Sequence, residues 1–351
     1  MTTPELERPD NPMRSAAPPE NLATTDVPRP KPRPFRALLA SRRTHLVLRI
    51  GALLVLLALL FRLLDSRTVI SALARADLGL VLVGIGLVQA QVLLSALRWK
   101  FTAGRLDLHL PLMRATREYY VAVFLNQVLP GGVAGDAVRT YRNRTHDAAG
   151  ESRWRASLRS VVLERAAGQV AFFVIAIGGL LAWPLLLPAS VPEDVEALVA
   201  VPVLIFAALA AIVAFAAMRG PKRIRGALTD IGPDIRNVFV RRGAWFYQAG
   251  LSLTIVSSYI AVFVVAGAAL GVAIPPIGWF TIVPMVLLAM LIPISIGGWG
   301  LREGAAAALF PLVGIDASLA LAVAILYGLI NLAGSLPGLW VFVATRARRI
   351  A

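Results

Sequence analysis

The sequence predicts an all-α polytopic membrane protein with about six full transmembrane helices plus two re-entrant helical hairpins arranged as an inverted repeat. Three observations lead to this fold class: the composition, the length of the apolar runs, and two places where proline and glycine interrupt those runs. Of the 351 residues, 58% are hydrophobic and only 16% are charged, whereas soluble domains are about a quarter charged. This composition excludes a soluble enzyme, a disordered protein and a fibrous protein.

The apolar runs are the predicted membrane segments. A spanning helix needs about 20 apolar residues, and most of the runs come close to that length. The full spans are expected at 46–64, 78–97, 161–187, 197–217, 246–270 and 317–344. The remaining runs, at 119–133 and 277–296, contain helix breakers.

Charge in the loops favours a re-entrant path for the two broken runs. If 119–137 and 277–312 each return to the side from which they enter, nearly all Lys and Arg fall on one side, leaving only Arg62, Arg67 and Arg75 opposite. Cytoplasmic loops collect basic residues. We therefore expect a multi-pass protein of the cell (plasma) membrane with cytoplasmic N- and C-termini.

Three regions are expected along the chain. Residues 1–45 are rich in Pro and Arg, a composition that predicts a disordered cytoplasmic arm. Residues 46–345 are expected to form the integral membrane domain, and residues 346–351 a basic cytoplasmic tail. The net charge of +15 is explained by basic loops, so nucleic acid is not an expected partner.

No metal or other cofactor is predicted. The chain has no cysteine, and its three histidines are far apart in the sequence without the spacing of a metal site. Most tryptophans are expected in belts at the two membrane surfaces: Trp99, Trp154, Trp183, Trp245, Trp279 and Trp340.

The two breaks resemble each other. When Pro130 is aligned with Pro293, 163 residues later, glycine recurs five positions on and arginine nine positions on, as Arg139 and Arg302. Interrupted helices in matching positions of inverted halves are typical of a transporter's midplane site. The repeat and the charge-based topology support each other.

The residues around the breaks are the candidate substrate-binding site. Broken helices leave backbone groups that only protein or a wet cavity can satisfy, glycines let N–H groups approach an anion, and arginine grips phosphate. We expect the two breaks to meet at one water-accessible cavity, with Arg139 and Arg302 facing it. The candidate set is Asn126, Pro130, Gly131, Gly132, Gly135, Asp136, Arg139, Glu164, Arg165, Gly297, Gly298, Trp299, Arg302 and Glu303.

Simpler explanations remain open for several of these residues. Asp136 and Arg139 have the spacing of a helix-capping pair. Glu164 and Arg165 could form a charge pair at the membrane surface, and Asn126 could satisfy backbone groups between helices.

Four motifs, in order, carry a resemblance to a known family. They are Asn126-x-x-Leu129-Pro130-Gly131-Gly132-x-x-Gly135-Asp136-x-x-Arg139, Ser160-x-x-x-Glu164-Arg165-x-x-Gly168, Ile296-Gly-Gly-Trp-Gly-Leu-Arg302-Glu303-Gly304 and Ser335-Leu-Pro337-Gly338. Over roughly residues 45–345 the chain resembles the lysylphosphatidylglycerol synthase transmembrane region, or flippase-like domain, family. The resemblance implies a stand-alone translocator. The soluble aminoacyl-transferase domain that follows this region in two-domain members is not expected here, so the chain is not expected to be an enzyme.

The predicted function is translocation of an anionic phospholipid or a lipid-linked envelope precursor. No nucleotide-binding G-x-x-x-x-G-K-[ST] motif is present, so transport is expected to be proton-coupled, through Asp136, Glu164 or Glu303, or downhill. Two alternatives stay open: an integral membrane transferase acting on a lipid carrier, and a non-transporting partner of a cell-envelope enzyme that docks through the arm. Membrane lipids, chiefly anionic ones, are the expected partners, and the oligomeric state is not predicted.

Overall fold

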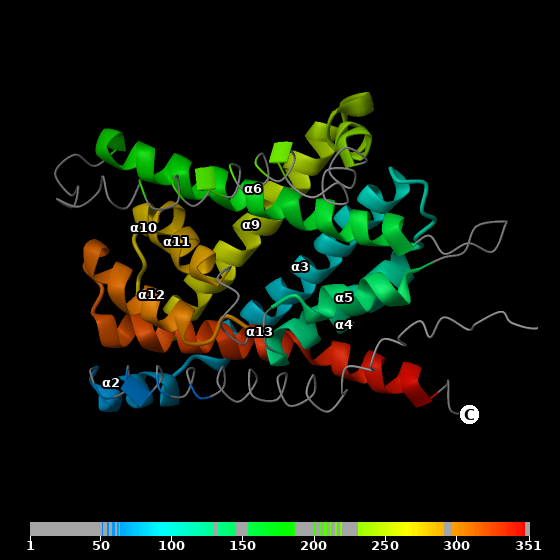
Figure 1. Ribbon diagram of the computed structural model, residues 1–351. Helices are drawn as coiled ribbons and strands as arrows, with labels where there is room; N and C mark the ends of the chain where they lie inside the picture. The colour runs from blue at the N-terminus through cyan, green and yellow to red at the C-terminus, as the bar shows by residue number, and fades with distance from the viewer. Residues whose placement is uncertain are drawn as a thin grey trace, which may run out of the picture. The chain divides into compact units, whose positions relative to one another are not determined.

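The computed structural model describes residues 64–129, 132–144, 154–186, 231–290 and 297–347, with isolated positions in 51–62 and 200–219. Every element in these ranges is a helix (Figure 1). The helices are α2 (Ser66–Ala74), α3 (Leu78–Gly104), α4 (Leu112–Val128), α5 (Ala134–Arg142), α6 (Trp154–Leu186), η2 (Arg236–Val240), η3 (Arg241–Gly243), α9 (Ala244–Ala269), α10 (Pro276–Phe280), α11 (Ile282–Ala289), α12 (Leu301–Leu309), η4 (Phe310–Val313) and α13 (Ala317–Ala347).

Within the described residues, four helices are long and apolar enough to cross a membrane: α3, α6, α13 and the segment that ends with α9. They correspond to four of the predicted spans. The runs 46–64 and 197–217 lie largely outside the described residues, as do the predicted arm and most of the basic tail. The all-helical membrane class is therefore confirmed, and the count of about six spans stays a prediction.

The ends of these helices follow recognisable capping chemistry. Asp77 precedes α3, and its carboxylate accepts a hydrogen bond from the backbone N–H of Leu80 at 3.1 Å. Such a cap satisfies one of the N–H groups left free at a helix start. Before α9 the chain turns through two left-handed residues, Arg242 with φ of 55° and Gly243 with φ of 68°. This turn ends η3 and sets the direction of α9.

Helix α3 continues past the predicted boundary at residue 97 because its last polar turns are buried. Arg98 and Trp99 are almost fully enclosed, and the Trp99 indole N–H donates to the Ser160 hydroxyl at 3.1 Å. The prediction that Trp99 and Trp183 lie in the belts at the membrane surfaces is therefore wrong, since each side chain is 1% exposed or less and packs inside the protein. Trp154, Trp245 and Trp340 remain exposed, as a belt residue requires.

The largest apolar core joins α9, α11, η4 and α13. The ring of Phe263 lies 5.6 Å from that of Phe310 and 5.0 Å from that of Tyr327. Helices also approach closely at small residues, as is usual between helices in lipid. A Cβ on Gly338 of α13, for example, would overlap the carbonyl oxygen of Tyr120 in α4.

Both predicted breaks separate helices that pack together. Helix α4 ends at Val128 and α5 begins at Ala134, and α5 returns antiparallel along α4, since the Arg142 guanidinium pairs with Glu118 at 2.7 Å. The second break lies between α11 and α12, which also contact each other. Pro130, Gly131 and Pro293 lie outside the described residues.

Candidate functional site

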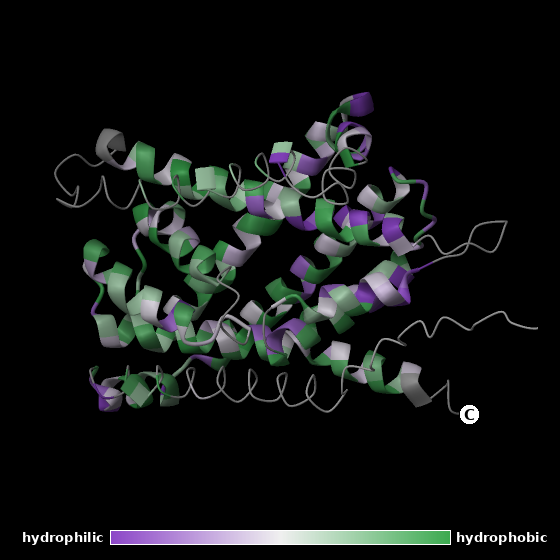
Figure 2. Cartoon of the chain, viewed as in Figure 1, coloured by the Kyte–Doolittle hydropathy of each residue, from purple (hydrophilic) through white to green (hydrophobic). Residues whose placement is uncertain are grey.

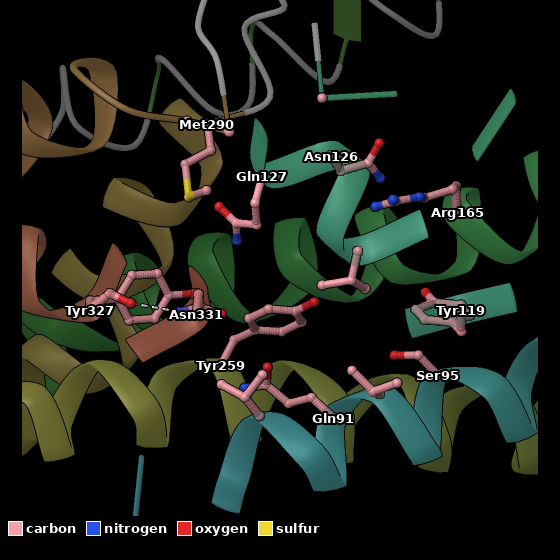
Figure 3. Close-up of a pocket in the computed structure, with 16 residues that line it drawn as sticks. Gln91, Ser95, Tyr119, Asn126, Gln127, Arg165, Tyr259, Met290, Tyr327 and Asn331 are labelled. Atoms are coloured by element: carbon pink, nitrogen blue, oxygen red, sulfur yellow. Dashed lines mark hydrogen bonds between the residues drawn. The ribbon is translucent and has the colours of Figure 1, made fainter. Parts of the chain in front are cut away.

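A polar cavity of about 200 Å³ lies where α3, α4, α6, α9 and α13 converge. Figure 3 shows the side chains of Gln127 and Tyr259 directed toward the same space. The polar side chains that line it come from these five helices: Gln91, Ser95, Tyr119, Asn126, Gln127, Arg165, Tyr259, Tyr327 and Asn331. We call this space the central cavity.

A second cavity of about 150 Å³ adjoins the first. The two share lining residues on α3, α4, α6, α9 and α13, namely Ser95, Tyr119, Arg165, Tyr259 and Tyr327, together with Met290. The second cavity extends toward Leu287 and Leu288 of α11. A ligand in the central cavity would therefore lie next to further space inside the bundle.

Both helix breaks contribute to the central cavity. Gly132 lines it from the first break, and Gly297 and Gly298 line it from the second. Gly297 has φ of 59°, and a Cβ there would lie 2.6 Å from the backbone oxygen of Gln127. Only glycine fits this backbone at this distance, so the second break lies directly against the end of α4.

Asn126 organises the start of α5. Its side-chain oxygen accepts a hydrogen bond from the Gly135 N–H at 2.7 Å, and its amide lies 3.4 Å from Asp136 Oδ2. A Cβ on Gly135 would overlap the carbonyl oxygen of Ala122, so glycine allows α5 to approach α4. Asn126 thus satisfies a backbone N–H at the start of α5, the simpler of the two roles considered for it, and it also lines the central cavity.

Five charged residues form an alternating chain of ion pairs beside the cavity. Glu164 accepts from Arg98 Nη2 and from Arg139 Nη2, both at 2.7 Å. Asp136 pairs with Arg139 Nε at 2.8 Å and with Arg165 Nη2 at 2.7 Å. This arginine–carboxylate chain joins α3, α6 and α5. It contains one more cation than anion among the residues that the structure describes.

Arg165 brings the surplus charge to the cavity. Its side chain is 41% exposed, whereas the side chains of Arg98, Arg139 and Glu164 are 5% exposed or less. Among the described residues, Arg165 is the one charged side chain that lines the central cavity.

Arg139 and Arg302 do not line the central cavity, contrary to expectation. Arg139 is fully buried in the arginine–carboxylate chain, with its guanidinium 4.8 Å from the Trp99 ring centroid and 4.7 Å from that of Tyr119. Bridging two carboxylates between aromatic rings holds it in the interior.

Arg302 has a matching environment at the second break. It pairs with Glu303, and its guanidinium lies 4.8 Å from the Trp299 ring centroid and 5.3 Å from that of Tyr327. Glu303 also accepts a hydrogen bond from the Gly300 N–H at 2.6 Å. The structure thus joins Trp299, Arg302 and Glu303 in a packed cluster apart from Asp136, Arg139 and Glu164.

Several cavity residues were not singled out from the sequence: Gln91, Ser95, Tyr259 and Tyr327. Gln91 and Ser95 are four residues apart within an apolar helix, a pattern that places them on one face and could have drawn attention. Gln91 Nε2 and Gln127 Oε1 are buried without a hydrogen-bond partner among the described residues. Such groups cost free energy unless water or a ligand satisfies them.

The described residues contain no group of three or more His, Cys, Asp or Glu that could hold a metal ion. The lining of the central cavity is instead amides, hydroxyls and one guanidinium, which suits hydrogen bonding to a neutral or anionic polar group.

Comparison with known proteins identifies the family. No curated protein matches the chain. A family model described as the lysylphosphatidylglycerol synthase TM region matches residues 46–338, which is most of the chain. The match and the apolar helices indicate a membrane protein of lipid or cell-envelope processes. The chain belongs to the lysylphosphatidylglycerol synthase TM region family.

Proposed function

We propose that the protein is a translocator, in the cell membrane, for an anionic phospholipid or a lipid-linked envelope precursor, with both termini in the cytoplasm. The observation that carries the proposal is the central cavity. It is lined by both helix breaks and presents the one partly exposed cation of the arginine–carboxylate chain.

The charge of the cavity suits a phosphate group. Arg165 already donates to Asp136, and its partly exposed guanidinium offers further donors to an anion. A lipid phosphate bound there would offset the one surplus positive charge of the arginine–carboxylate chain. The amides of Gln91 and Gln127 would hydrogen-bond the rest of the headgroup, which satisfies their unpaired atoms.

The path of α4 and α5 fits the re-entrant prediction. Because Arg142 at the end of α5 pairs with Glu118 near the start of α4, the two ends of this helix pair lie side by side. The break between them then reaches into the bundle and returns. Non-helical backbone at membrane depth is tolerated where it lines a polar cavity.

The carboxylates favour transport over group transfer. Glu164 binds the guanidiniums of Arg98 and Arg139, and Asp136 binds those of Arg139 and Arg165. Glu303 binds the Arg302 guanidinium and accepts a hydrogen bond from the Gly300 N–H. Each is held by an arginine, and among the described residues no carboxylate lines the central cavity, where acid–base chemistry would need one. The same occupancy favours downhill movement over proton coupling.

A leaflet-exposure assay tests the proposal. Purified protein is reconstituted in liposomes that contain fluorescent phosphatidylglycerol, and an impermeant quencher reports lipid that reaches the outer leaflet. We expect wild-type protein to move the lipid. R165Q should reduce the rate at least about tenfold, the effect expected when a charge-assisted hydrogen bond to phosphate is lost.

The control is R117Q, which removes an exposed arginine outside the cavity and should transport normally. Transport by the purified chain would also argue against a purely partnering role beside an envelope enzyme. Unchanged transport by R165Q, or no transport by the wild type, would contradict the proposal.

A further inference from the structure

A third pocket lies away from both cavities, at the junction of the last turns of α3 with the start of α9. It has a volume of about 430 Å³ and is lined by Leu97, Lys100, Phe101, Gly104, Arg105 and Tyr247. None of these residues lines the central cavity or the cavity that adjoins it. We call it the junction pocket.

The junction pocket is basic. Lys100 is exposed, and the guanidinium of Arg105 is held at the pocket wall by donating to the Arg241 carbonyl oxygen at 3.0 Å and by lying 5.1 Å from the Phe101 ring centroid. None of the six lining residues is acidic. The pocket therefore presents two cations to an incoming anion.

Its neighbourhood adds to the positive potential. Arg241 and Arg242 are exposed in the left-handed turn directly before α9, and Arg236 is exposed one turn earlier. Figure 2 shows hydrophilic residues gathered at this end of the helices, around the last turns of α3 and the start of α9. Oriented cations around a small concave surface concentrate anions from solution or from a membrane.

Two aromatic side chains, Phe101 and Tyr247, line the pocket, and a second aromatic pair lies beside it on the first turn of α9. The Phe101 and Tyr247 rings lie 4.4 Å apart, and Trp245 stacks on Phe246 at 3.6 Å. Trp245 and Phe246 are 53% and 67% exposed. Amphipathic aromatic rings with free faces are typical of the level of lipid headgroups, so a lipid fits this surface better than a free anion does.

The two helix ends that form the junction pocket belong to the predicted cytoplasmic side. Anionic lipids give the cytoplasmic leaflet its negative surface potential, and basic pockets between transmembrane helices on that side bind anionic headgroups. We propose that the junction pocket binds the phosphate of an anionic phospholipid of the cytoplasmic leaflet through Lys100 and Arg105, with Phe101 and Tyr247 against its glycerol and upper acyl region. This site is separate from the transport cavity.

Tryptophan quenching tests the site with the full-length protein. The chain is placed in nanodiscs of phosphatidylcholine that contain a rising fraction of phosphatidylglycerol with brominated acyl chains, which quench nearby tryptophans. Tyr247 lines the junction pocket, so the difference between Y247W and the wild type isolates the signal of a tryptophan placed in the pocket.

We expect the tryptophan of Y247W to be quenched at a lower fraction of brominated phosphatidylglycerol than of brominated phosphatidylcholine, and the K100Q and R117Q changes are made in this variant. K100Q should raise the fraction needed for half-quenching about fivefold, the contribution of one cation near an anionic surface. R117Q, an exposed arginine outside the pocket, is the matched control and should not change it. Because Lys100 is exposed, its replacement should leave the melting temperature unchanged.

Three results would overturn the proposal. The first is equal quenching by the two brominated lipids, and the second is a K100Q curve that coincides with that of Y247W alone. The third is displacement of the lipid by millimolar inorganic phosphate, which would assign the pocket to a soluble anion. All three are independent of whether the protein moves lipid, because the junction pocket and the central cavity share no residue.

Discussion

Arg165 differs from the other two arginines of the arginine–carboxylate chain because its side chain is 41% exposed while those of Arg98 and Arg139 are buried. The neighbouring pairs place Arg139 between two carboxylates and two aromatic rings, where it holds α5 to α6. One arginine therefore connects helices, and the other is available to a ligand. The corresponding arginine of the second break, Arg302, also lies between two aromatic rings beside a carboxylate.

Replacing Arg139 should destabilise the fold. R139A removes two charge-assisted contacts of a fully buried side chain, to Asp136 and to Glu164, and at about 1.5–3 kcal/mol for each such hydrogen bond the loss should be about 3–6 kcal/mol. Denaturant unfolding in detergent would measure the change. R165Q should cost much less, because its side chain is 41% exposed and Asp136 keeps Arg139. Equal losses in the two variants would contradict the division of roles.

At the scale of elements, the helix pair α4–α5 depends on close backbone approach. Gly135 places the start of α5 against Ala122, while Asn126 accepts from the Gly135 N–H. The second break then lies against the end of α4 through Gly297. Asn126 and Gly297 line the central cavity, so the spacing of these helices affects its size.

A methyl group at Gly135 should separate the pair. G135A would force a Cβ into the Ala122 carbonyl, and overpacking of this kind costs about 1–3 kcal/mol. Thermal unfolding in detergent would report it as a lower Tm. The matched control is G178A in α6, where a Cβ meets nothing within 4 Å, so stability should hold or rise by about 0.5–1 kcal/mol. A G135A protein as stable as the wild type would disprove the close-approach argument.

At the scale of the whole molecule, the sequence predicts what depends on local patterns. Runs of apolar residues identify α3, α6, α9 and α13, and proline with glycine marks both breaks. Long-range pairing is different: Arg98 and Glu164 are 66 positions apart, and nothing near either residue shows that they meet. That contact buries Glu164 and, through it, Arg139. With Arg139 buried in this way, the arginine that reaches the cavity is Arg165, the residue after Glu164 in the sequence.

The same limit explains the side chains of the cavity that sequence patterns did not single out. Tyr259 and Tyr327 belong to helices that meet only in the folded bundle, and a tyrosine in an apolar run is usually a packing residue. Glycines were better guides, because Gly297 and Gly298 adopt backbone angles that other residues rarely take.

The central claim is that the two breaks meet at one water-accessible cavity that holds an anionic headgroup, and cysteine accessibility tests it most directly. The chain has no native cysteine, so Q127C can report on the cavity and L253C, on an exposed apolar face of α9, can serve as the lipid-facing control. In vesicles, we predict that a charged, water-soluble thiol reagent labels Q127C and not L253C, and that phosphatidylglycerol slows the labelling more than phosphatidylcholine does. An unreactive Q127C, or equal labelling with the two lipids, would contradict the account.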